Sequence, residues 1–162
     1  MQKWECEFSR YELLLCLAGQ NGATVYENYD FTNTRLKGLY GDGIIALGKS
    51  LSEYDKNCVL AEEIGHHETS YGNILDMSNE PNRKQELKAR AYAYDLLVGL
   101  NGILNAFLRG CINKFEVSEY LQVTEEFLDE ALYYYRQKYG TCATIGNYVI
   151  YFEPSIGVFE LC

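Results

Sequence analysis

The residues best suited to do chemistry lie within one short run, Glu62-Glu63-Ile64-Gly65-His66-His67. The run is similar to the H-E-x-x-H motif of zinc peptidases. In that motif two histidines one helical turn apart bind the ion, and the glutamate between them activates a water. Glu62 stands where the first histidine is expected. By position, His66 is then the second metal ligand and Glu63 the general base.

The spacing of the run supports this interpretation. Residues four apart lie on one face of a helix and can share an ion, whereas the next residue lies about 100° around the helix. A general base needs that offset, because it must reach the water without binding the metal itself. Glu63 and His67 are also four apart, but using them as ligands would consume the base. We therefore favour Glu62 and His66, and expect His67 to orient the substrate or a metal ligand. Gly65 leaves room for another backbone or for the substrate.

A tetrahedral catalytic site needs a third protein ligand and one open position. Glu86 is a candidate because helical spacing aligns it with a stripe expected to face the core, formed by Ala89, Ala93, Leu97 and Leu100. A carboxylate aligned with a buried stripe is costly unless a charge or a metal compensates it. Glu86 also falls in the first turn of its helix, where the dipole favours acidic residues. Spacing alone therefore leaves the metal role open.

Two segments together resemble the ImmA/IrrE metallopeptidases, over roughly residues 10–140. They are the run from Glu62 to His67 and the segment from Glu86 to Leu97, which is similar to the family pattern E-x-x-A-x-x-F-A-x-x-L-L. The resemblance implies that Glu62, His66 and Glu86 bind the metal and that Glu63 is the catalytic base. It also implies a minimal zincin fold, and residues 37–40 look like the family's edge strand beside the active site.

Zinc is the cofactor that the resemblance implies. Two glutamates and one histidine form a harder, more anionic ligand set than the usual one, so manganese or another oxygen-preferring divalent ion is an alternative. The added negative charge should also weaken the ion's ability to acidify its water.

The pattern of the chain predicts a single α+β domain over residues 1–162. We expect a motif-bearing core over residues 1–110, a helical pair over 111–140 and a β-hairpin tail over 141–162. Within the core, the spacing predicts helices over 5–17, from a cap at Ser52 or Asp55 to about Glu68, and over 83–109. Residues 23–31 read as extended, residues 37–47 as two strands around an Asp-Gly turn, and residues 70–82 as a polar connection. Further along, a turn near 123–124 separates two helices within 114–139.

A small antiparallel sheet is expected to pack on the motif helix. Residues 41–46 would lie along the cleft, where an extended substrate could add to the sheet by main-chain hydrogen bonds. Gly43, Ile44 and Ile45 are therefore the predicted substrate-binding residues.

Composition limits the classes of function. The formal net charge of −9 argues against non-specific binding to nucleic acid or to anionic membranes. The six cysteines include no C-x-x-C pair, so we expect free thiols and no cysteine-based metal site. With no signal-peptide pattern and no apolar run of membrane-spanning length, a cytoplasmic protein is expected.

Residues 114–135 have the cadence of a helix-turn-helix, with Thr124 as the cap of the second helix. That helix would present Glu125, Glu126, Asp129 and Glu130, which phosphates would repel. We interpret the region as a packing element without direct contact to nucleic acid.

Three hypotheses follow. The first is an intracellular metallo-endopeptidase whose substrate, by family resemblance, is a helix-turn-helix repressor of a phage or mobile element. The second is a catalytically inactive relative that binds the repressor as an anti-repressor. The third, a DNA-binding regulator, is disfavoured by the distribution of charge. The sequence indicates no oligomeric state.

Overall fold

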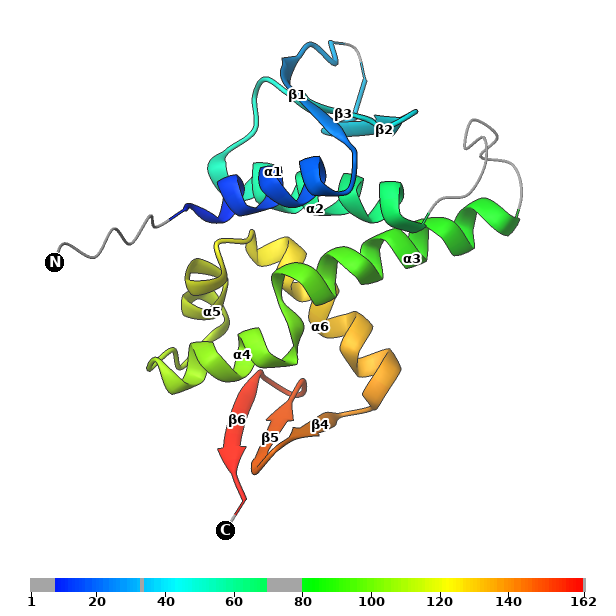
Figure 1. Cartoon of the computed structure of the whole chain (residues 1–162). Coiled ribbons are helices and arrows are strands. Elements are labelled where there is room, and N and C mark those ends of the chain that lie inside the picture. The colour runs from blue at the N-terminus through cyan, green and yellow to red at the C-terminus, as the bar shows by residue number, and fades with distance from the viewer. Residues whose placement is uncertain (1–7, 33, 70–79, 162) are drawn as a thin grey trace, which may run out of the picture.

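The computed structural model describes residues 8–32, 34–69 and 80–161. A three-stranded sheet lies at one end of the molecule over α1 and α2, and α3 passes along the other side of α2 (Figure 1). The remaining helices and a second sheet form the opposite end. In chain order the elements are α1 (Arg10–Gln20), β1 (Thr24–Tyr29), β2 (Gly38–Gly41), β3 (Ile44–Gly48), α2 (Glu53–Thr69), α3 (Glu80–Leu97), α4 (Gly99–Leu108), α5 (Lys114–Leu121), α6 (Glu125–Tyr139), β4 (Cys142–Ile145), β5 (Tyr148–Tyr151) and β6 (Gly157–Glu160).

The fold confirms the predicted α+β class. The helix predicted over 5–17 begins later, at Arg10, because Ser9 forms a capping box with Glu12; residues 1–7 lie outside the described residues. Ser52 is the cap of α2, since its Oγ accepts the Asp55 backbone N–H at 3.1 Å. Most of the predicted connection over 70–82 also lies outside the described residues.

The N-terminal sheet has the strand order β1-β3-β2. Strands β2 and β3 are antiparallel and meet at the predicted Asp-Gly turn, where Asp42 and Gly43 have φ of 49° and 78°. Strand β1 instead runs parallel to β3. The sheet is therefore mixed, because the chain crosses from β1 to the far side of β3 before it forms the hairpin.

This order corrects the predicted place of substrate addition. The main chain of Ile45 pairs with Val25 on one side and Tyr40 on the other, and its side chain is fully buried. Strand β3 is thus the central strand, and Gly43 lies in the turn before it, where its carbonyl accepts the Thr24 N–H. Ile44 begins the same central strand. An extended chain cannot pair along residues 44–46, and the edge strand that packs on α2 is β2.

Helices α2 and α3 pack at very short range where Gly65 faces Ala89. A Cβ added at Gly65 would lie 2.3 Å from the Ala89 carbonyl oxygen, so glycine is required for this approach. The predicted core stripe is confirmed for Ala89, Ala93 and Leu97, which are almost completely buried. Leu100 lies in the next helix and is partly buried, and the Glu86 side chain is 43% exposed. The close crossing brings the motif helix against the helix that carries Glu86.

The long helix predicted over 83–109 is instead two helices, α3 and α4, with a break at Val98. Gly99 has a φ of +55°, which ends the helical path. The buried hydroxyl of Tyr135 accepts the Gly99 N–H at 3.1 Å and lies 3.0 Å from the Tyr94 carbonyl oxygen. One side chain of α6 thereby satisfies the Gly99 N–H, and it adds a second bond to the Tyr94 carbonyl oxygen, which already accepts the Val98 N–H at 2.9 Å.

The stretch Arg83–Leu108 is long and apolar enough, by length and composition, to cross a membrane. It contains the break at Gly99, and its buried residues, which include Ala93, Leu97, Ile103 and Ala106, belong to the hydrophobic core. We therefore assign the stretch to the core of the domain.

The C-terminal part confirms the helical pair and extends the predicted hairpin. Thr124 caps α6 by accepting the Phe127 N–H at 3.2 Å. Strands β5 and β6 form the expected hairpin, and β4 adds to β5 to make a three-stranded antiparallel sheet. Ile150, Phe152 and Ile156 of this sheet and its turn join the common core with α6.

Candidate active site

Glu63 lies in the interior between α2 and strand β2. Its side chain is only 9% exposed. A Cβ at Gly38 would come within 2.8 Å of Glu63 Oε1, so the strand approaches the carboxylate as closely as a glycine allows. Burial raises the pKa of Glu63 to about 7, while the charge of His66 and the backbone N–H of Tyr40 oppose this increase. A carboxyl group with a pKa near neutrality can both accept and return a proton.

His66 and Glu86 face each other across the α2–α3 contact. The His66 Nε2 and Glu86 Oε2 atoms are 3.2 Å apart. The hydrogen bond from His66 lowers the pKa of Glu86 to about 2, and Arg90 contributes to the same effect. Burial opposes protonation of His66, but the hydrogen bond to Glu86 and the charges of Glu63 and Glu62 outweigh it and raise the pKa of the imidazole.

Glu62 lies one helical turn before His66 on α2, and it lines a polar cleft. The cleft has a volume of about 230 Å³ and includes Lys37, Arg90, Glu126 and Glu130 in its lining. Burial raises the pKa of Glu62, whereas the positive charge of Arg90 opposes the increase. The Glu62 carboxylate thus lies one helical turn from His66, and it shares the cleft with the guanidinium group of Arg90.

Arg90 is the functional residue that the sequence reasoning missed. Its Nε donates to Glu86 Oε1 at 2.8 Å, and its Nη1 lies 3.8 Å from Glu130 Oε2. Tyr94 in turn donates to Glu130 Oε2 at 2.8 Å. Glu86 therefore directs one oxygen at Arg90 and the other at His66. The spacing of four between Glu86 and Arg90 was a usable signal for this pair, whereas nothing local marked Glu130 on α6.

His67 has a different role from its neighbour. Its Nε2 lies 2.7 Å from the carbonyl oxygen of Asn21, and because a carbonyl only accepts, this nitrogen carries the proton. Its Nδ1 lies 3.0 Å from the Tyr40 hydroxyl. Both ring nitrogens are engaged, so His67 ties α2 to the end of α1 and to β2. The bond from His67 to Tyr40 fixes strand β2 beside Glu63, and a contact of His67 with substrate stays a prediction.

The donor set fits a divalent ion in type, since imidazole and carboxylate are ordinary zinc and manganese ligands. The distance between one pair of donor atoms, on His66 and Glu86, also fits a divalent ion. Two ligands of a tetrahedral zinc are about 3.3 Å apart when their bonds are about 2.0–2.1 Å, close to the separation of His66 and Glu86. Among the described residues, no three His, Cys, Asp or Glu side chains are arranged to hold an ion. Glu62 would have to turn from the cleft toward the pair.

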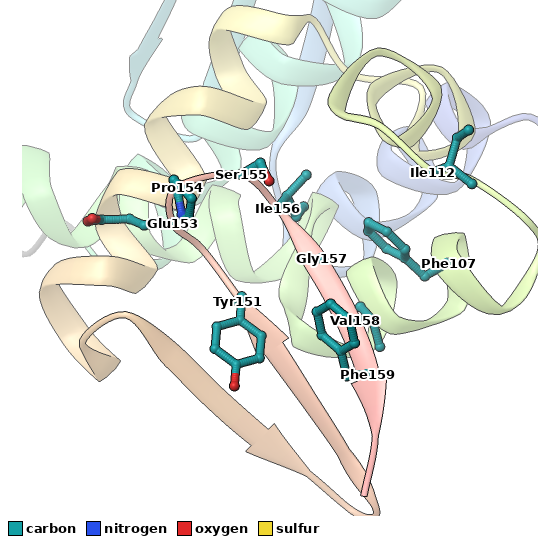
Figure 2. Close-up of a pocket in the computed structure, with 10 residues that line it drawn as sticks. All are labelled: Phe107, Ile112, Tyr151, Glu153, Pro154, Ser155, Ile156, Gly157, Val158 and Phe159. Atoms are coloured by element: carbon teal, nitrogen blue, oxygen red, sulfur yellow. The ribbon is translucent and has the colours of Figure 1, made fainter.

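Two further features border or resemble the site without belonging to it. Cys58 lines the cleft, but burial raises the pKa of its thiol to about 11, so it remains neutral and packs as expected for a small hydrophobic residue. The described cysteines, which are Cys16, Cys58, Cys111 and Cys142, are free thiols as predicted. A mainly apolar hollow of about 580 Å³ lies at the C-terminal sheet, and Figure 2 shows the residues that line it. Its one acidic residue, Glu153, is paired with Arg136.

Together, the motif helix, the edge strand and the His66–Glu86 pair around a buried glutamate define a metallopeptidase-like domain. Comparison with protein families identifies the IrrE N-terminal-like domain, Peptidase_M78, over residues 19–133. The chain belongs to this family, which confirms the resemblance given by the two sequence segments. A comparison with curated proteins and one with solved structures gave no match.

Proposed function

We propose that the protein is a metal-dependent endopeptidase that cleaves a specific protein in the cytoplasm. The observation that carries the proposal is the position of Glu63, a buried carboxyl group that faces Gly38 of strand β2 and lies on the helix of the His66–Glu86 pair. Family membership supports the same class of activity. The proposed substrate is a helix-turn-helix repressor of a phage or mobile element.

Glu62, His66 and Glu86 would hold the ion, with zinc as the first candidate and manganese as the alternative. When bound, a divalent ion supplies Lewis-acid polarisation of the peptide carbonyl and lowers the pKa of a water. Glu63 accepts a proton at its carboxylate from the attacking water and then returns it to the leaving amine. Arg90 keeps one oxygen of Glu86 engaged, which leaves the other directed at His66.

The substrate would lie extended along β2. This strand is at the edge of the sheet and packs on α2, and its first residue, Gly38, touches the side chain of Glu63. Main-chain pairing with an edge strand gives affinity that does not depend on substrate sequence. It would also place a peptide bond next to the base.

Co-expression with the repressor encoded by the same genetic element tests the proposal. The wild-type protein should cause loss of the full-length repressor and appearance of two fragments on an immunoblot. Glu63→Gln should leave the repressor intact, because glutamine cannot accept the proton. The matched control is Glu68→Gln, an exposed glutamate on the same helix, and it should cleave like the wild type.

The second candidate is an inactive relative that only binds the repressor. One observation favours it. Arg90 forms an ion pair with Glu86, so part of the negative charge of the site is compensated without a metal ion. The same co-expression separates the two. If Glu63→Gln relieves repression as well as the wild type does, and the repressor remains full length in both, binding and not cleavage is the mechanism.

A further inference from the structure

A groove between α3 and α6 continues from the candidate active site. It has a volume of about 650 Å³, within the range of pockets that accept small ligands and large side chains. Its lining comes from two faces, with Leu87, Arg90 and Tyr94 on α3 and Asp129, Glu130, Tyr133, Tyr134 and Gln137 on α6. Arg90 and Glu130 line this groove and also the cleft that contains Glu62.

The groove exposes apolar surface beside a candidate metal ligand. Leu87 follows Glu86 directly and is 61% exposed, and Tyr133 on the facing helix is 63% exposed. Two of the tyrosines that line it pack together: the ring centroids of Tyr94 and Tyr134 are 5.7 Å apart, and the Lys138 Nζ lies 5.3 Å from the centroid of Tyr134. Rigid tyrosines with an exposed edge are typical of protein recognition sites, because they bury large area at a low entropic cost.

The charge of the cleft beside the groove is negative. Its lining has four carboxylates, Asp55, Glu62, Glu126 and Glu130, and two cations, Lys37 and Arg90. In the groove itself, Asp129 is already paired with Lys114. The cations in the cleft are already paired, Arg90 with Glu86 and Lys37 with Asp55. An occupant that carries lysine or arginine beside an apolar side chain would complement this surface, whereas an acidic one would be repelled.

We propose that the α3–α6 groove is the specificity site of the enzyme and binds a large apolar side chain of the substrate polypeptide, with a neighbouring basic residue of the substrate in the acidic cleft. The inference rests on the proposed function, since it takes the occupant to be the chain that is cleaved. Two observations favour a basic polypeptide over a small apolar ligand as the occupant. The groove is continuous with the cleft of the candidate active site through Arg90 and Glu130, and that cleft is negatively charged.

Selection of peptides tests the groove without requiring hydrolysis. A phage-displayed library of random dodecapeptides is selected on immobilised Glu63→Gln protein, and the enriched peptides are titrated by fluorescence anisotropy. We expect enrichment of an aromatic or large aliphatic residue next to lysine or arginine. Leu87→Ser and Tyr133→Ser, each placed in the same background, should weaken binding at least about 10-fold. Tyr120→Ser, an exposed tyrosine on α5 outside the groove, should not change it.

Enriched peptides without the basic–apolar pair, or binding that is equal in Tyr133→Ser and Tyr120→Ser, would overturn the proposal. Because all three substitutions are at exposed positions, thermal melts should confirm that each variant folds. The outcomes separate the two proposals. Groove-dependent peptide binding, together with a wild-type protein that leaves the repressor intact, refutes the endopeptidase. Cleavage by the wild type that is unaffected by Leu87→Ser and Tyr133→Ser refutes the groove.

Discussion

Gly65→Ala should disrupt the packing that forms the site. The added Cβ would lie 2.3 Å from the Ala89 carbonyl oxygen and 3.0 Å from its carbonyl carbon. The two helices must separate by about 1 Å to restore an ordinary contact of 3.4 Å. Overpacking costs about 1–3 kcal/mol, and a backbone neighbour cannot rotate away, so we expect the upper end. Alanine returns about 1 kcal/mol of helix propensity. The net loss of unfolding free energy should be about 2 kcal/mol.

Gly19→Ala is the matched control. Gly19 also lies within a helix, α1, but a Cβ there meets nothing within 4 Å. The same substitution should therefore stabilise the protein by up to about 1 kcal/mol. Urea denaturation of the metal-free proteins, followed by far-UV circular dichroism, gives both values. A Gly65→Ala protein as stable as the wild type would refute the inferred contact between α2 and α3.

Three further predictions concern the charges and the strand around Glu63. Gly38→Ala places a Cβ 2.5 Å from Val59 Cγ1 and 2.8 Å from Glu63 Oε1. It should therefore displace the base and reduce repressor cleavage at least about 10-fold. The control is Gly41→Ala in the same strand, where a Cβ meets nothing within 4 Å, and it should not reduce cleavage. Because burial raises the pKa of Glu63 from 4.5 to about 7, the folded metal-free protein holds a proton that the unfolded chain releases, and stability should fall by up to about 3 kcal/mol as the pH rises through that window. Glu63→Gln cannot ionise, so in urea denaturation it should exceed the wild type in stability at pH 8 and not at pH 4.5; an unchanged difference between the two pH values would contradict the assigned burial. Arg90→Gln should lower the stability of the metal-free protein by about 1 kcal/mol, because the Arg90–Glu86 pair is partly exposed. The loss should be smaller in a Glu62→Gln background. Strictly additive effects of the two substitutions would show that Arg90 does not compensate the charge of Glu62.

The sequence was sufficient for features encoded by local pattern. The Asp-Gly turn, the Thr124 cap and the buried residues Ala89, Ala93 and Leu97 each depend on residues close together in the chain. The sequence left Ser52 and Asp55 as alternative caps of α2, and the structure selects Ser52. The His66–Glu86 pair was also predictable, because each residue belongs to a helix with a recognisable family pattern.

The parts that were missed depend on contacts between distant residues. The break at Gly99 is satisfied by the hydroxyl of Tyr135 on another helix, so a helical pattern over 83–109 could not reveal it. The parallel pairing of β1 with β3 depends on the path of the chain after α1 and moves Ile45 from a predicted cleft into the core. Glu130 reaches the site only because α6 packs against α3.

The central claim is that His66, with Glu62 and Glu86, forms a divalent metal site. Elemental analysis of the protein purified without chelators tests it most directly. We expect about one zinc or manganese ion per chain in the wild type, none in His66→Ala, and an unchanged content in His67→Ala, whose ring nitrogens bond to Tyr40 and Asn21. A wild-type protein that retains no metal after addition of zinc or manganese, or equal loss in the two histidine variants, would contradict the account.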